Sequence, residues 1–261
     1  MICSSLRKRE PPDFRNQLSI EARFCQTERE RSSESVSFAV SKGVVVNRED
    51  GEKLRGELIA TCEKLHRGGL IAATDGNVSC RVDEGLLLIT PSGKAKGELQ
   101  REDLLVVDLE GHVVQGSGRP SSEIRMHLLV YRMRRDVCAI VHAHPPMLTA
   151  FTLCDLPFPA DCLPEVWLTI GPVPTAPYAT PSTEEVPRSI APLVAAHEAI
   201  LLERHGSLTF GKNLAEACMR LQKLEHAAHT LYHACLLKRE MPSPLSKEAL
   251  EKLRQLGHAQ K

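Results

Sequence analysis

The sequence lacks several features, and each absence excludes a class of function. Aromatic residues make up only 4% of the 261 residues. Lys plus Arg equals Asp plus Glu at 33 each, so no excess of either charge favours nucleic acid or a charged membrane surface as a partner. No apolar run approaches the roughly 18 residues that a membrane-spanning helix needs. These absences predict a globular protein that acts on neither nucleic acid nor membrane.

Cysteine spacing and the N-terminus are equally restrictive. The nine cysteines are an odd number and include no C-x-x-C pair, which argues against a disulfide scaffold or a structural zinc knuckle. The first residues lead into Arg7-Lys8-Arg9 without an apolar segment, so we expect no signal peptide. Both observations predict a reducing, cytoplasmic location.

The chain divides into three parts by composition. Residues 1–46 are rich in Arg, Glu and Ser, are interrupted by Pro11-Pro12, and have few apolar positions. Such a segment buries too little surface to offset the entropy of ordering, so we predict a disordered extension. We expect one folded domain over residues 47–240 and a helical tail over residues 241–261.

Helical and strand-like patterns alternate along the folded part. Apolar residues at helical spacing predict helices near residues 50–67, 121–133, 147–153, 183–197, 213–235 and 247–256, the last ending at Gly257. Short apolar runs predict strands at 78–82, 86–90, 104–108, 138–144, 166–170 and 199–202, with a strand and turn at 205–211. This interleaving predicts an α/β fold with a central mixed sheet and helices on both faces.

Two histidines carry the strongest chemical signal. His142 and His144 lie in the run C-A-I-V-H-A-H, which Pro145-Pro146 terminates. Side chains at i and i+2 of a strand point to the same face, so both imidazoles would meet at one point. That arrangement predicts a divalent metal site at the edge of a sheet.

A catalytic zinc site usually has a third protein ligand and one open position. The other histidines weighed for that place are His127, His197, His205, His226, His229 and His233. His205 is favoured because it follows an apolar strand and precedes Gly206, where no side chain blocks a close approach. The last three have helical spacing and are interpreted as packing or surface residues.

Glu123 begins the helix that precedes the histidine strand. A carboxylate beside a metal can act as a ligand or carry a proton. A glutamate in the first helical turn also complements the helix dipole, and both roles remain open.

Three small polar turns form a second pattern, Gly76-Asn77, Ser92-Gly93 and Ser121-Ser122. Each combines backbone N–H groups with a short polar side chain. Together they are suited to bind a phosphate through amides and hydroxyls, provided that the fold brings them to the metal.

Five motifs in order resemble the class II aldolase/adducin-domain family, and within it L-fuculose-phosphate aldolases. They are G-G-L-I-A-A-T-D-G-N-V-S-C-R, I-T-P-S-G, G-x-x-S-S-E-x-x-x-H, I-V-H-A-H-P and E-R-H-G-S-L, and the resemblance covers about residues 50–237. The resemblance implies a three-layer α/β/α sandwich around a mixed or antiparallel sheet, and a homotetramer. It implies one Zn²⁺ on His142, His144, His205 and Glu123, with Glu123 also the catalytic acid/base. The six residues of the polar turns would hold the substrate phosphate.

The implied reaction is cleavage of a phosphorylated ketose, such as L-fuculose 1-phosphate, into dihydroxyacetone phosphate and an aldehyde through a metal-stabilised enediolate. Aldolases of this type carry a tyrosine in the C-terminal tail, whereas Leu245 to Lys261 contains none. This departure keeps neighbouring reactions open: pentulose-phosphate 4-epimerisation, methylthioribulose-phosphate dehydration and tetronate-phosphate decarboxylation. A non-catalytic adducin-like module would be expected to lack histidine ligands that are present here.

Overall fold

Within residues 48–259, eight strands form one sheet in the order β4-β3-β2-β1-β5-β8-β7-β6. The structure is a computed structural model that describes residues 48–259. Within these residues, neighbouring strands pair antiparallel except β6 and β7, which are parallel. The strands are β1 Asn77–Asp83, β2 Leu86–Ile89, β3 Leu105–Asp108, β4 Val113–Gln115, β5 Ala139–Ala143, β6 Thr175–Ala176, β7 Ala199–Leu202 and β8 Gly206–Gly211.

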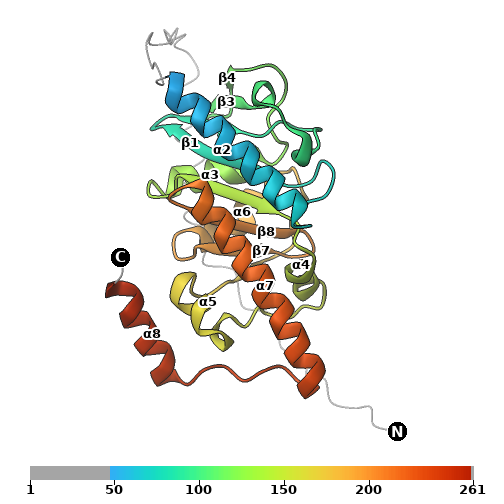
Figure 1. Cartoon of the computed structure of the whole chain (residues 1–261), viewed down its shortest axis with the longest axis vertical. Helices are drawn as coiled ribbons and strands as arrows, with labels where there is room; N and C mark the ends of the chain where they lie inside the picture. The colour runs from blue at the N-terminus through green and yellow to red at the C-terminus, as the bar shows by residue number, and fades with distance from the viewer. Residues whose placement is uncertain (1–47, 260–261) are drawn as a thin grey trace, which may run out of the picture. The chain divides into compact units, whose positions relative to one another are not determined.

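Helices cover both faces of this sheet. Apolar residues of α2 Arg48–Arg67, α4 Pro146–Leu153, α5 Pro164–Thr169 and α7 Leu214–Lys238 form one core with one face. Residues of α3 Ile124–Met133 and α6 Glu185–Val194 form a second core with the other face. Figure 1 shows α2 and α7 running across the same side of the sheet. The predicted α/β/α sandwich around a mixed sheet is therefore confirmed.

Strand β5 shows how the sequence pattern produces the two cores. Ala139, Val141 and Ala143 are buried toward the α2/α7 side, whereas Ile140 is buried toward the α3/α6 side. A strand alternates its side chains between faces, so His142 lies on the same face as Ile140. The central strand is apolar on both faces because helices cover both.

The long helix α7 begins where the sequence predicts. The Asn213 side chain accepts a hydrogen bond from the backbone N–H of Glu216 at 2.8 Å, which satisfies one of the unpaired donors of the first turn. At the other end of the fold, α2 ends at Arg67, immediately before Gly68-Gly69.

The predicted strand over residues 166–170 is wrong. Residues 166–169 belong to α5, which Ile170 caps; this helix has Pro164 at its first position and Glu165 in its first turn. Proline there fixes a helical φ and lacks only an N–H that would be unpaired anyway. Val166 of α5 is buried in the core. The packing of this helix against the core outweighs the preference of a short apolar run for a strand.

Other differences concern the ends and edges of elements. The short outer strands β4 and β6 were not predicted, because two or three residues give no period to detect. The last helix, α8 Lys247–Ala259, continues past Gly257, where the sequence predicted its end. The predicted extension over residues 1–46 lies outside the described residues.

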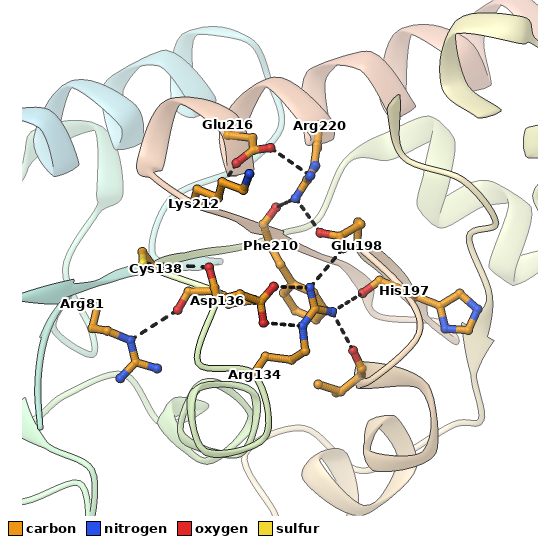
Figure 2. Close-up of polar contacts among 12 residues, drawn as sticks. Arg81, Arg134, Asp136, Cys138, His197, Glu198, Phe210, Lys212, Glu216 and Arg220 are labelled. Carbon is orange, nitrogen blue, oxygen red and sulfur yellow. Dashed lines mark hydrogen bonds and ion pairs between the residues drawn. The ribbon is translucent and has the colours of Figure 1, made fainter. Parts of the chain in front are cut away.

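An ion-pair network lies at the N-terminal end of β5 and the C-terminal end of β8 (Figure 2). Glu198 binds both Arg134 and Arg220, at 3.0 Å and 2.8 Å. Arg134 also binds Asp136 at 2.7 Å, and Arg220 binds Glu216 at 2.9 Å. The network ties the loops before β5 and β7 to the start of α7.

Among residues 48–259, no helix is long and apolar enough to cross a membrane.

Candidate metal centre

The C-terminal end of β5 delivers the first two histidines. His142 is fully buried in the strand, whereas His144 follows the last strand residue and its backbone N–H binds Leu70 O at 3.0 Å. The predicted strand over residues 138–144 is therefore shorter at both ends. The two imidazoles nevertheless converge, with their Nε2 atoms 3.0 Å apart.

His205 reaches the same point from the turn between β7 and β8. Its ring centroid lies 4.8 Å from that of His142 and 4.9 Å from that of His144. Gly206 makes this approach feasible, because a Cβ there would overlap Ala143 O and lie 2.9 Å from Cδ2 of His144. The close approach that the sequence predicted at Gly206 is thus made by the backbone of β5 and by a neighbouring histidine.

Glu123 turns its carboxylate toward the histidines. The predicted helix start at Ser121 is wrong: α3 begins at Ile124, and the Glu123 side chain makes no capping hydrogen bond. Its Oε2 lies 3.1 Å from Nε2 of His142, and its Oε1 lies 3.2 Å from Nε2 of His205. The carboxylate therefore contacts the histidines and does not cap the helix.

The four side chains have the form of a metal site. One ligand atom from each of Glu123, His142, His144 and His205 lies within 4.8 Å of all the others. Glu123 Oε1 is buried and has no hydrogen-bond partner, although His205 is close. A buried acceptor normally has a partner, and a cation between the imidazole nitrogens and this oxygen would provide one. The donor set fits a divalent transition metal.

Protonation states agree with this interpretation. Burial, followed by the nearby His142, lowers the pKa of both His144 and His205 to about 4. Burial alone would raise the pKa of Glu123, but His142, His205 and the Asn77 hydrogen bond hold it well below its usual range. At neutral pH the site therefore presents neutral imidazoles at His144 and His205 and an ionised carboxylate at Glu123, which are the forms that bind metal.

A hydrogen bond fixes the ring orientation of His142. Its Nδ1 donates to the backbone carbonyl of Ser207 at 3.0 Å, so that its Nε2 faces the cluster. Nδ1 of His144 lies 3.7 Å from a carboxylate oxygen of Asp75, which is beyond hydrogen-bond distance. The contact with Ser207 sets the tautomer of His142 and keeps Nε2 directed at a ligand.

A buried chain of hydrogen bonds supports Glu123 from behind. Asn77 Nδ2 donates to Glu123 Oε2 at 3.0 Å, and Asn77 Oδ1 accepts from His127 Nε2 at 2.5 Å. Nδ1 of His127 then accepts from Ser79 Oγ at 2.7 Å, and that hydroxyl lies 2.9 Å from Tyr131 Oη. His127, one of the histidines considered as a third metal ligand, therefore supports Glu123 through Asn77 and lies outside the cluster.

The three polar turns meet beside this cluster. A cavity of about 330 Å³ is lined by Glu123, His144, His205 and all six turn residues, Gly76, Asn77, Ser92, Gly93, Ser121 and Ser122. Gly76 has φ +70°, and a Cβ there would lie 2.8 Å from His142 O, so this turn can approach the histidine strand only as glycine. The convergence on which the phosphate hypothesis depends is present.

The remaining histidines lie elsewhere. Within the part of the chain that the structure describes, the potential metal ligands gather in the one group already given, which excludes His197, His226, His229 and His233. His197 Nδ1 donates to Leu193 O at 2.8 Å. His229 lies 3.4 Å from Glu225 on the same helix.

Two charged residues near the site were missed from the sequence. Glu225, 6% exposed on α7, accepts the backbone N–H groups of Met147 and Leu148 at 2.9 Å and so anchors the helix that follows His144. Lys96 lines the cavity and is buried. Neither has a local signal, because a glutamate within a helix and a lysine in a turn usually face solvent.

Comparison with known proteins agrees with this geometry. The profile of the Class II Aldolase and Adducin N-terminal domain matches residues 56–232. The chain is 33% identical over 185 residues to a 3-oxo-tetronate 4-phosphate decarboxylase of Pectobacterium atrosepticum, covering 69% of this chain and 84% of that protein. It is 34% identical over 209 residues to an L-fuculose phosphate aldolase of Escherichia coli O6:H1, covering 78% and 96%.

A solved structure shows the same fold. The crystal structure of YgbL from Klebsiella pneumoniae superposes with a TM-score of 0.72 at 32% sequence identity, covering 78% of this chain and 99% of that one. The family profile spans most of the described residues and includes all four side chains of the cluster. The chain therefore belongs to the class II aldolase and adducin N-terminal domain family.

Proposed function

We propose that this protein is a zinc-dependent aldolase that cleaves a phosphorylated ketose, such as L-fuculose 1-phosphate, into dihydroxyacetone phosphate and an aldehyde. The observation that carries the proposal is the convergence of three imidazoles and the unpartnered oxygen of Glu123 at a cavity lined by polar turns. The family and its aldolase members support the type of reaction.

His142, His144, His205 and Glu123 would hold the ion. When bound, Zn²⁺ would act as a Lewis acid that polarises the substrate carbonyl and stabilises the negative charge of the enediolate. The hydrogen bond from His142 to the Ser207 carbonyl keeps that ring oriented to bind it. Other divalent transition metals suit the same donors.

Glu123 is the proposed acid/base. Its low pKa makes it ionised at neutral pH, so in the direction of aldol addition it can take a proton from the dihydroxyacetone carbon. In the direction of cleavage it returns that proton after the C3–C4 bond has broken. Oε1 would take this role when the substrate replaces Glu123 as a ligand, because Oε2 is held by Asn77.

The substrate phosphate would lie against Gly76, Asn77, Ser92, Gly93, Ser121 and Ser122. Their backbone amides and side chains line the cavity that contains Glu123. A phosphate fixed there would place the neighbouring ketose carbons at the metal ligands. This arrangement uses the binding energy of a non-reacting group to orient the reacting carbons.

A second candidate is decarboxylation of a 3-oxo-tetronate 4-phosphate at the same site. It is favoured by the decarboxylase relative and by the absence of tyrosine from residues 245–261. Loss of CO2 from such a substrate also leaves an enediolate, so the same residues would serve. Pentulose-phosphate epimerisation and methylthioribulose-phosphate dehydration would use the same ligands.

The test combines metal analysis with product detection. Zinc-loaded protein is incubated with L-fuculose 1-phosphate and, separately, with 3-oxo-tetronate 4-phosphate, and release of dihydroxyacetone phosphate or CO2 is followed. We expect about one metal per chain and cleavage that Glu123→Gln abolishes and that Glu84→Gln, in an exposed turn, leaves intact. CO2 release from the tetronate without cleavage of L-fuculose 1-phosphate would replace the aldolase with the decarboxylase, and absence of bound metal would overturn both.

The assembly and location are also proposals. We expect a homotetramer in a reducing, cytoplasmic environment. The seven described cysteines are all free thiols, which suits that environment. Light scattering after gel filtration would measure the mass, and a monomer or dimer would contradict the tetramer.

A further inference from the structure

Lys96 is buried at the junction of two of the turns that line the cavity. It is 2% exposed. Its Nζ donates to the backbone carbonyls of Thr74 at 2.9 Å and Lys94 at 2.8 Å. Its backbone N–H binds Ala73 O at 3.1 Å. Lys96 therefore fastens the segment before Gly76-Asn77 to the segment after Ser92-Gly93.

No ion pair balances the charge of Lys96. Among the ion pairs of residues 48–259, none includes Lys96, whereas its exposed neighbour Lys94 binds Asp103. A buried ammonium that forms no ion pair is unfavourable, and burial accordingly lowers the pKa of Lys96, although the nearby Asp75 carboxylate acts in the opposite direction. An ammonium has three donors, of which two are satisfied by carbonyls, so one donor and the net charge are left for a ligand.

The place of Lys96 indicates what that ligand is. Lys96 is the sole Lys or Arg among the described residues that line the 330 Å³ cavity, where the other ionisable side chains are Asp75, Glu123 and two histidines. The polar turns offer neutral donors, which orient a phosphate but do not balance two negative charges. A dianion in this cavity would balance the positive charge of Lys96, and Lys96 would balance part of the negative charge of the dianion.

We propose that Lys96 is the charged residue of the phosphate-binding site and selects phosphorylated over unphosphorylated substrates. The inference rests on the proposed function, because it needs a phosphorylated substrate in this cavity. It adds a residue to that function, since the turns alone were expected to bind phosphate without a positive side chain. The competing explanation is that Lys96 only fastens the two turns together.

The experiment measures the affinity of sn-glycerol 3-phosphate, with glycerol as the uncharged control, by calorimetry on metal-free and zinc-loaded protein. Lys96→Met keeps the length of the side chain and removes its charge. We expect it to weaken glycerol 3-phosphate binding roughly 10–100-fold in both forms, as for a lost charged hydrogen bond. Lys96→Arg, which keeps the charge, should retain more affinity than Lys96→Met. Lys94→Met, the matched control, should stay within about twofold of wild type.

Turnover measurements distinguish selection of phosphorylated substrates by Lys96 from a purely structural role in holding the two turns together. With the phosphorylated sugar, Lys96→Met should raise KM, whereas any activity on the same sugar without phosphate should change little. A purely structural role predicts an equal loss on both substrates and equal affinities for Lys96→Met and Lys96→Arg. Zinc content near the wild-type value and a cooperative thermal transition show that the variants are folded.

The outcomes distinguish this inference from the function on which it rests. Wild-type protein that binds no glycerol 3-phosphate would overturn the phosphate site and Lys96 together. Equal binding by wild type and Lys96→Met would overturn Lys96 alone. Should Lys96→Met not fold, ¹³Cε-labelled lysine in wild-type protein provides the answer. The resonance that is lost in Lys96→Arg must shift on addition of glycerol 3-phosphate, and an unchanged resonance would contradict the proposal.

Discussion

The two ends of the β5/β8 strand pair both hold clusters of ionisable side chains, but the clusters differ in how they are satisfied. At one end, Arg134 and Arg220 share Glu198, and each also binds a second carboxylate (Figure 2). At the other end, three imidazoles surround one carboxylate, and Glu123 Oε1 has no hydrogen-bond partner. The ion-pair network is complete by itself, whereas the histidine cluster is complete only with a cation.

This difference shows how a structural cluster is distinguished from a binding site. In the ion-pair network, both arginines have carbonyl partners in addition to their carboxylates, Val194 O and His197 O for Arg134 and Phe210 O for Arg220. Convergent lone pairs with one orphaned oxygen require a ligand. Substitutions at the histidine end should therefore affect metal binding and turnover, and substitutions at the network end should affect stability.

The largest effect is expected for His142→Ala. This change removes an imidazole at the centre of the cluster, 3.0 Å from His144 and 3.1 Å from Glu123. Loss of an outer-shell partner usually costs roughly 10–100-fold in metal affinity, so loss of a ligand should exceed that range and abolish turnover. Competition with a chelator measures the affinity. Wild-type zinc affinity in the His142→Ala protein would contradict the proposed metal centre.

The second prediction is that the free energy of unfolding depends on pH through His127, at the histidine end. Burial lowers the pKa of His127 to about 3, whereas in the unfolded chain it is about 6.5. Between these values the unfolded state binds more protons, so the free energy of unfolding falls as pH falls. From pH 6.5 to 5 the loss from this one group is about 2 kcal/mol.

Urea unfolding of metal-free wild type and His127→Gln at several pH values measures it. The stability advantage of wild type should shrink as the solution becomes more acidic. Asp136 provides the contrast, because hydrogen bonding to Arg134 lowers its pKa. Its contribution is present above about pH 4 and is lost below it, so Asp136→Asn should not alter the slope between pH 6.5 and 5. Equal slopes for wild type and His127→Gln would contradict the prediction.

At the network end, Glu198→Gln should reduce stability by about 2 kcal/mol, since it removes the charge that both arginines share. Zinc affinity should stay within about twofold of wild type, because the network lies at the opposite end of the strands. Denaturant unfolding and the chelator assay measure the two quantities on the same protein. A large loss of zinc affinity would show that the two ends are coupled.

The smallest effect on stability is expected for Glu225→Gln. This change should affect both stability and zinc affinity. Glu225 accepts the N–H groups of Met147 and Leu148, close to His144, so the change should cost about 1 kcal/mol of stability and about tenfold in zinc affinity. Glu216→Gln, on the same helix but in the ion-pair network, is the matched control. It should lower stability by a similar amount and leave zinc affinity unchanged. Equal zinc affinities in the two variants would remove the positioning role of Glu225.

The sequence determined much of the site, because its signals are local. Two local signals indicated the histidines of the site. One is the i, i+2 spacing of His142 and His144 before two prolines, and the other is the glycine that follows His205. Asn213 and the helical period that follows it likewise define α7. The same local reasoning failed at residues 166–170, where an apolar run resembles a strand and only packing against the core makes it the helix α5.

Tertiary structure alone decided which charges are satisfied. Glu225 and Glu216 occupy the same helix, yet one anchors the segment after His144 and the other belongs to the ion-pair network. Lys94 and Lys96 are two residues apart, yet one binds Asp103 at the surface and the other is buried at the cavity. Local sequence sets the period and the turns. The energy of a charge depends on which distant groups share its low-dielectric surroundings, and only the folded chain brings those groups together.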